Sequence, residues 1–208
     1  TQVFPLPGSV FVHNRLTHSL EVACVGMSLG NDVARHLCAE NRDYIDTLIP
    51  EIGQIVATAC LAHDLGNPPF GHSGEKAIQT FFTEGKGLYL REKVSPLFWD
   101  DITRFDGNAN AFRLLTHSFK GRRQGGFAMT YSTLASIVKY PFTSSLAGRK
   151  SKFGFFNSEA DTYQKTRRQS APHARSRIPA PFIPSTVAAC PTTDSPRASM
   201  LTAQTVTK

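Results

Sequence analysis

The residues from about Thr17 to Ala39 carry apolar side chains on two faces of a helix, and this pattern limits the possible folds most strongly. The first stripe consists of Leu20, Ala23, Cys24, Met27, Ala34 and Leu37, and the second of His18, Val22, Val25, Leu29 and Val33. A helix that is apolar on two faces is normally buried between other elements. The pattern therefore predicts a helical core in which this helix is enclosed.

The rest of the first 164 residues also follows helical spacing. An apolar stripe from Ile52 to His63 starts after Pro50, which suits the first turn of a helix, and Gly66-Asn67-Pro68-Pro69 ends it. Further helices are expected from near Gly71 to Phe82, over 109–118 and over 131–138. We therefore predict an all-α fold for residues 1–164.

The composition changes abruptly near Gln164. Residues 165–208 contain six of the 13 prolines, one aromatic residue and many Ser, Thr, Ala and Arg residues. Such a segment buries too little apolar surface to offset the entropy that ordering costs. We predict a partial domain over 1–164 and a disordered tail over 165–208. This tail is either an ordinary disordered segment or a stretch translated in a wrong reading frame.

The net charge of +7 comes mainly from the tail, which holds seven Lys and Arg residues and one acid. The near-neutral remainder gives no indication of a nucleic-acid surface. The four cysteines have no metal-site spacing, and the sequence has neither a signal peptide nor an apolar run long enough to span a bilayer. We expect a soluble, cytoplasmic protein. Because the chain opens with Thr1 inside an apolar stretch, we also expect that an N-terminal portion is missing.

His63-Asp64 is the first pair of residues that suggests chemistry. The pair stands at the end of an apolar helix, where an unpaired imidazole and carboxylate would be costly to bury. A divalent metal ion would satisfy both side chains, and this ligand type suits transition metals better than Mg²⁺. Such a pair arises by chance in roughly one chain in five of this length, so it is weak alone.

His18 strengthens the metal interpretation, because it lies on the other helix expected to be buried. An isolated histidine there would be read as a satisfied core residue. Two helices that each supply ligand types favour one shared metal ion instead. Arg15 stands one turn before His18, where it is either a solvated charge or a ligand for phosphate, whose oxygens suit a guanidinium fork.

His72 and Glu75 follow the break after the second helix. Their i, i+3 spacing places them on one helical face, and a histidine paired with a carboxylate is a common acid–base arrangement. Ser73 and Glu75 also suit a helix cap, and the two interpretations are compatible.

Several motifs together resemble the bacterial dGTPase branch of the HD phosphohydrolase superfamily. The most specific is His63-Asp64-Leu65-Gly66-Asn67-Pro68-Pro69-Phe70-Gly71-His72-Ser73-Gly74-Glu75. Others are Thr17-His18-Ser19-Leu20-Glu21-Val22, Phe105-Asp106-Gly107-Asn108-Ala109, Thr130-Tyr131-Ser132-Thr133-Leu134, Lys139-Tyr140-Pro141 and Lys152-Phe153-Gly154-Phe155-Phe156-Asn157-Ser158-Glu159. The resemblance covers the chain from Thr1 to about Tyr163.

This resemblance implies an all-helical HD-domain bundle, a divalent metal such as Mg²⁺ or Mn²⁺, and hydrolysis of a dNTP to deoxynucleoside and tripolyphosphate. His18, His63 and Asp64 match metal ligands, and His72 and Glu75 match the catalytic pair. Arg15, Asn67, Lys139 and Tyr140 match positions near the substrate. A homo-oligomer is expected for the full-length protein.

One departure from the family pattern weakens the expected activity. The family completes its metal site with a second Asp, in a helix beyond the Lys-Phe-Gly-Phe-Phe motif, and here that region is the Pro-rich tail. Asp194 lies there without helical pattern, so it does not inherit the role. We therefore expect an impaired enzyme. Two alternatives stay open: a non-catalytic nucleotide-binding or oligomer subunit, and another HD phosphohydrolase acting on a cyclic dinucleotide or nucleoside monophosphate.

Overall fold

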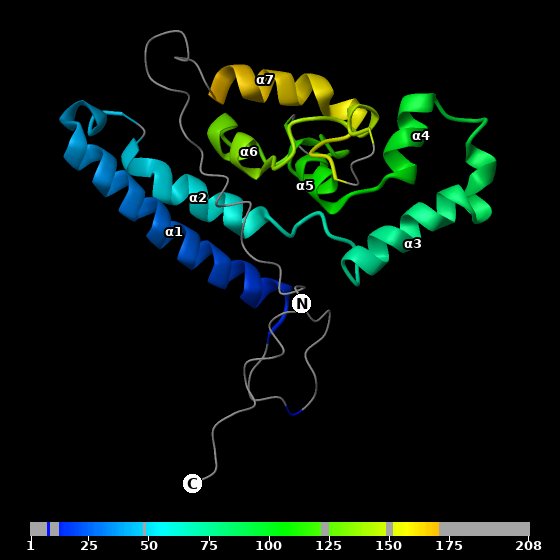
Figure 1. The fold of residues 1–208 in the computed structure, drawn as a ribbon, viewed down its shortest axis with the longest axis horizontal. Helices are drawn as coiled ribbons and strands as arrows, with labels where there is room; N and C mark the ends of the chain where they lie inside the picture. The colour runs from blue at the N-terminus through cyan, green and yellow to red at the C-terminus, as the bar shows by residue number, and fades with distance from the viewer. Residues whose placement is uncertain (1–7, 9–12, 48, 122–124, 149–151, 171–208) are drawn as a thin grey trace.

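The computed structural model describes residue 8 and residues 13–47, 49–121, 125–148 and 152–170. Within these ranges the fold is all-α, as predicted (Figure 1). The helices are α1 (Arg15–Glu40), α2 (Ile52–Ala62), α3 (His72–Thr83), α4 (Pro96–Thr103), α5 (Gly107–Thr116), α6 (Tyr131–Ile137) and α7 (Ala160–Ser170). The five helices expected from the sequence are confirmed. α4 and α7 were not predicted from the sequence.

α1 and α2 lie side by side in opposite directions (Figure 1). Asn14 fixes the start of α1, because its side chain accepts hydrogen bonds from the backbone N–H groups of Leu16 and Thr17. The two helices approach closely at Gly30, where a Cβ atom would stand 2.8 Å from the Cα of Gly53. Small residues therefore set the distance between these helices.

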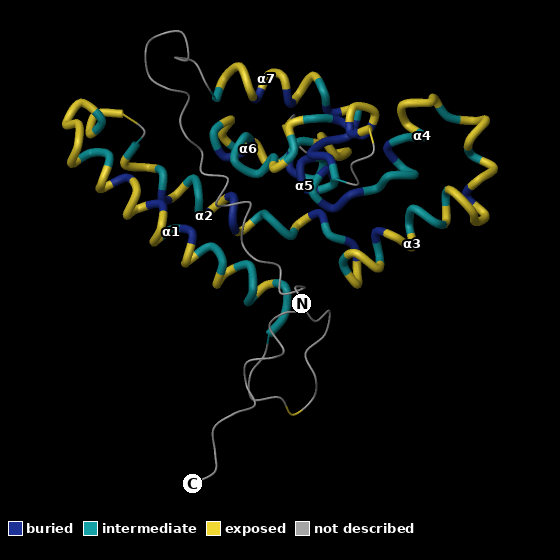
Figure 2. Tube along the Cα trace, viewed as in Figure 1, coloured by how far each residue is buried: buried dark blue, intermediate teal, exposed yellow. Residues whose placement is uncertain are grey.

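The expectation that α1 is buried on two faces was wrong for this chain. Its buried residues are Gly26, Gly30 and Ala34, and much of the helix surface is exposed (Figure 2). Of the second stripe, Val25, Leu29 and Val33 are exposed, and His18 and Val22 are half-buried. Val25 and Leu29 expose 61% and 59% of their surface. Among the described residues, packing against α2 covers one face of the helix and leaves the other uncovered.

The core lies around α5 and combines two aromatic clusters (Figure 2). Phe112 is fully buried, with Phe155 and Tyr163 packed beside it, and Phe153 and Phe156 form the neighbouring cluster. A buried polar network ties α4 to this core: Asp101 accepts hydrogen bonds from the Ser144 hydroxyl and the Asn157 backbone. Burial raises the pKa of the Asp101 carboxyl above its ordinary value, although these hydrogen bonds oppose the effect.

α7 crosses the boundary that the composition suggested after Gln164. The helix continues to Ser170, and the side chain of Thr166 is fully buried. Tyr163 stacks on Phe155 with ring centroids 4.1 Å apart. Residues 165–170 are thus part of the folded region. They are mostly polar, but they continue a helix whose start is packed on the core through Tyr163. The predicted tail beyond residue 170, including Asp194, lies outside the described residues.

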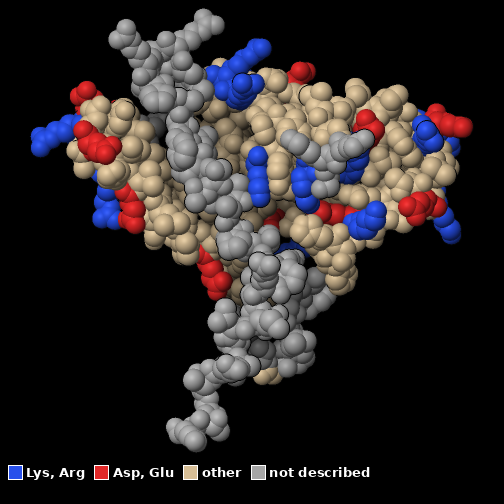
Figure 3. Space-filling view, in the orientation of Figure 1, with Lys and Arg blue, Asp and Glu red and all other residues tan. Residues whose placement is uncertain are grey.

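No helix in the described part of the chain is long and apolar enough to cross a membrane. Basic and acidic side chains are interspersed at both ends of the face shown in Figure 3.

Candidate metal centre

His18, His63 and Asp64 meet where the start of α1 faces the end of α2. One possible ligand atom from each of them lies within 4.8 Å of the others. Asp64 Oδ1 is 3.3 Å from His63 Nε2, and Asp64 Oδ2 is 4.0 Å from His18 Nε2. The side chains are only partly exposed, by 28%, 30% and 20% in chain order. The structure thus brings together the three residues expected to be metal ligands.

The orientation of His63 suits a metal ligand. Its Nδ1 lies 2.6 Å from the Cys60 carbonyl oxygen, which can only accept, so Nδ1 carries the proton. In the neutral ring, the lone pair is then on Nε2, which faces Asp64. A lone pair directed at a carboxylate is unfavourable without a cation between them, and a backbone carbonyl commonly orients metal-bound histidines in this way. The residues present therefore fit a divalent cation.

Asn67 holds the carboxylate of this group. Its side-chain amide donates a 2.7 Å hydrogen bond to Asp64 Oδ1. The substrate contact expected of Asn67 stays a prediction, and in the structure its amide contacts a proposed metal ligand. The i, i+3 spacing of Asp64 and Asn67 around the end of α2 makes this contact possible.

Arg15 forms hydrogen bonds with the turn that follows α2. Its guanidinium donates to the backbone carbonyls of Asn67, at 2.7 Å, and of Pro68. These bonds fix α1 to the turn and occupy donors that were predicted to contact phosphate. The phosphate contact of Arg15 stays a prediction.

A sharp turn places His72 at the start of α3. Phe70 and Gly71 both have positive φ values, 65° and 55°, and Phe70 is 78% exposed. Only glycine adopts this conformation without strain, and strained backbone collects at functional sites. His72 is exposed at the N-terminus of α3, where backbone N–H groups favour anions.

Glu75 does not pair with His72 as the sequence analysis expected. Its carboxylate accepts a 2.8 Å hydrogen bond from the Gly107 backbone N–H and forms a 3.0 Å ion pair with Lys152. Within the described part of the chain, the side chain of His72 forms no hydrogen bond or ion pair. Spacing on one helical face brings the two residues near each other, but the buried partners of Glu75 draw its carboxylate towards α5.

Lys152 joins two buried carboxylates. Its ammonium lies 3.0 Å from Glu75 Oε2 and 3.3 Å from Asp106 Oδ2, and Asp106 is almost fully buried. Burial lowers the pKa of Lys152, but the charges of Asp106 and Glu75 outweigh this and raise it above its ordinary value. No local spacing in the sequence predicts this cluster, because its members stand far apart along the chain.

Lys139 and Tyr140 follow α6, on a segment that turns back towards Phe142. The Lys139 ammonium lies 5.6 Å from the centroid of the Tyr140 ring. Their expected contact with a nucleotide stays a prediction.

The family model for the HD domain matches residues 15–140, which include the whole metal group and most of the helices. The chain belongs to the HD domain family. The match contains the proposed ligands His18, His63 and Asp64, and it agrees with the helical fold.

Proteins similar to this HD domain carry closely related names. One from Pseudomonas aeruginosa, called a deoxyguanosinetriphosphate triphosphohydrolase-like protein, is 46% identical over 76% of this chain and 36% of its own length. A protein of the same name from Synechocystis sp. is 43% identical over 78% and 39%. The deoxyguanosinetriphosphate triphosphohydrolase of Yersinia pseudotuberculosis is 32% identical over 88% and 42%. The chain spans about two fifths of the length of these relatives.

Proposed function

We propose that this HD domain carries the metal site of a dNTP triphosphohydrolase acting on dGTP or a related deoxynucleotide. The observation that carries the proposal is the convergence of His18, His63 and Asp64 from two helices within 4.8 Å. Support comes from the related proteins, whose names refer to dGTP triphosphohydrolase activity.

The reaction is hydrolysis at the α-phosphorus of the nucleotide. The water oxygen forms a bond to phosphorus, the bond to the 5′-oxygen breaks, and a proton passes to that oxygen. The products are the deoxynucleoside and tripolyphosphate. A divalent ion such as Mn²⁺ or Mg²⁺ would supply Lewis acidity and a water of lowered pKa.

The other roles in the reaction are assigned to residues of this chain. His18, His63 and Asp64 would hold the ion, and the hydrogen bond from Asn67 fixes the Asp64 carboxylate. His72, at the exposed start of α3, delivers the proton to the leaving 5′-oxygen. Glu75 fixes α3 against α5 through Gly107 and thereby positions His72. We assign contacts with the nucleotide to Lys139, Tyr140 and Arg15.

We also propose that the chain turns over slowly. Three of the four family ligand positions have a counterpart among the described residues, so one carboxylate fewer holds the cation. A smaller ligand charge weakens cation binding. Turnover below the usual enzyme range of roughly 1–10³ per second is therefore expected.

The test identifies the products after prolonged incubation of residues 1–208 with dGTP and Mn²⁺, by ³¹P NMR and anion-exchange chromatography. Deoxyguanosine and tripolyphosphate are expected. His72→Ala should reduce the rate about 10²–10⁴-fold without changing Mn²⁺ content. His36→Ala, an exposed histidine towards the other end of α1, is the matched control.

Release of dGMP and pyrophosphate would contradict the proposed reaction. Bound Mn²⁺ without any product would favour the non-catalytic nucleotide-binding alternative. An unchanged rate in His72→Ala would remove His72 from the mechanism.

A further inference from the structure

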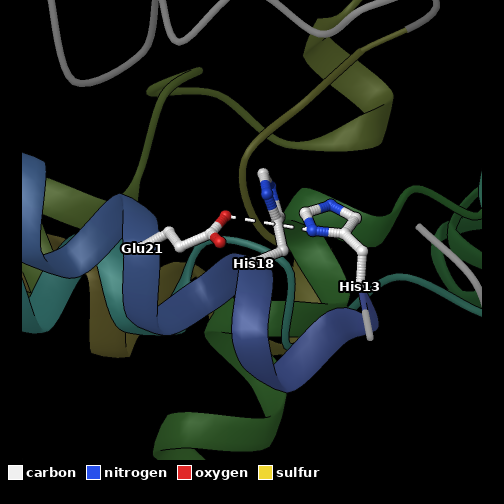
Figure 4. A group of neighbouring side chains, drawn as sticks. All are labelled: His13, His18 and Glu21. Carbon is white, nitrogen blue, oxygen red and sulfur yellow. Dashed lines mark ion pairs between the residues drawn. The ribbon is translucent and has the colours of Figure 1, made fainter. Parts of the chain in front are cut away.

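A second group of potential ligands lies beside the first, on the outer side of His18. His13, His18 and Glu21 each offer one ligand atom, and these atoms lie within 4.8 Å of one another. Figure 4 shows His13 just before α1 and Glu21 on α1, on either side of His18. We call His18, His63 and Asp64 the first ligand set, and His13, His18 and Glu21 the second ligand set.

The helix start places the second ligand set. His18 and Glu21 are spaced i, i+3 and therefore share a face of α1. The cap at Asn14 turns the chain so that His13 folds back onto this face. His13 Nδ1 then lies 3.9 Å from Glu21 Oε2, and the His13 and His18 ring centroids are 5.8 Å apart.

The structure assigns the second ligand set as an alternative site for a divalent transition metal that uses His18 in place of the first. Two imidazoles and one carboxylate suit Zn²⁺, Co²⁺ or Cu²⁺ far better than Mg²⁺. His13 and Glu21 are 38% and 57% exposed, which leaves room for water ligands and a route for the ion. Binding of one ion at about 2.0–2.2 Å requires the three ligand atoms to move closer together. The exposed side chains of His13 and Glu21 can rotate to do so.

His18 makes the two sites exclusive. A neutral imidazole has one lone pair and one N–H, so it can be a ligand of one ion at a time. An ion in the second ligand set withdraws His18 and leaves His63 and Asp64 as the only protein ligands of the first. If the proposed function holds, excess transition metal should inhibit hydrolysis through His13, whereas excess Mg²⁺ should not.

The binding test uses Co²⁺ absorption, which reports its ligands and does not depend on activity. His63→Ala/Asp64→Asn removes the first ligand set and leaves His18 in place. This double variant of the full chain should bind one Co²⁺ more weakly than wild type. Addition of His13→Ala should weaken Co²⁺ binding at least about tenfold, as expected for the loss of a ligand. Addition of His36→Ala, the matched control, should not change it.

Two outcomes would overturn the assignment. One is that the double variant binds no Co²⁺, and the other is that its binding does not respond to His13→Ala. Far-ultraviolet circular dichroism checks that each variant is folded.

A second measurement needs no variant and covers the case in which the double variant fails to fold. Wild-type protein is treated with Cu²⁺, ascorbate and peroxide, which oxidise the ligands of bound copper. Peptide mass spectrometry should find His13 oxidised well above His36. Equal oxidation of the two residues would also overturn the assignment. Neither measurement depends on dGTP hydrolysis. A protein that lacks the proposed activity can therefore still show metal binding at the second ligand set, and the two failures can be told apart.

Discussion

The α1–α2 pair and the aromatic core around α5 are stabilised in different ways. Around α5, large side chains such as Phe112 and Phe153 are fully buried and fill the interior. Between α1 and α2, glycines allow a close approach, while Val25 and Leu29 of α1 face outwards. The proposed metal ligands belong to the second region. Their positions thus depend on how closely two helices approach, and less on the amount of apolar surface buried.

The difference also concerns charge. The core region contains the buried carboxylates of Glu75 and Asp106, which form ion pairs with the Lys152 ammonium. The α1–α2 region instead gathers His18, His63 and Asp64, whose possible ligand atoms lie within 4.8 Å of one another. Carboxylates paired with a lysine stabilise a fold, whereas two imidazoles and a carboxylate close together suit a divalent cation.

The largest effect is expected from Lys152→Met. The substitution leaves Glu75 and Asp106 buried without their cation, and breaking a buried ion pair in this way costs about 3–5 kcal/mol. Urea unfolding at neutral pH measures the loss. Lys76→Met, at an exposed position of α3, is the control and should change stability by less than about 0.5 kcal/mol. Equal effects of the two substitutions would show that the Lys152 ion pairs do not stabilise the core.

Gly30→Ala tests the close approach of α1 and α2. The new Cβ atom would meet the Gly53 backbone at 2.8 Å, so the helices must separate, at about 1–3 kcal/mol. Gly26→Ala is the matched control in the same helix, because its Cβ would meet a side-chain atom, the Cys60 sulfur, and not the backbone. Thermal unfolding and Co²⁺ affinity should both fall in Gly30→Ala and fall less in Gly26→Ala. A larger loss in Gly26→Ala than in Gly30→Ala would contradict the idea that Gly30 sets the distance between α1 and α2.

Asn67→Ala should weaken the metal centre with little effect on folding. The side chain orients Asp64, and loss of such a contact typically lowers metal affinity about 10–100-fold. Asn110→Ala is the control, because Asn110 holds the same turn through the Gly66 carbonyl without touching a proposed ligand. Equilibrium dialysis with Mn²⁺ compares them. Equal losses of Mn²⁺ affinity in the two variants would mean that metal binding depends on the turn and not on the contact between Asn67 and Asp64.

The sequence predicted the helices well wherever apolar spacing was regular. It missed α4, which spans only Pro96–Thr103, and it ended the fold before the last turns of α7, whose residues are polar. Periodicity gives little signal in short or polar helices, since few of their residues are buried: in α7 these are Tyr163 and Thr166.

The proposed site was predictable in its residues and less so in its contacts. His18, His63 and Asp64 came from motif positions, and the structure brings them together. The partners of Glu75 and Arg15 were not predictable. Glu75 pairs with Lys152, which is distant in the sequence, and Arg15 donates to a backbone group, the Pro68 carbonyl. Side-chain spacing along one helix cannot show which distant buried group competes for a carboxylate.

The exposed stripe of α1 provides the smallest expected effect. Val25 and Leu29 are 61% and 59% exposed, so Val25→Thr/Leu29→Gln should change the free energy of unfolding by less than about 0.5 kcal/mol. Removal of this apolar surface should also raise solubility, because exposed apolar patches promote association. Chemical denaturation and light scattering measure the two quantities. The opposite face of α1 offers the comparison, since Ala34→Ser at a buried position should cost more. A loss above about 2 kcal/mol in the double variant, a size typical of truncated core side chains, would show that another part of the protein covers this stripe.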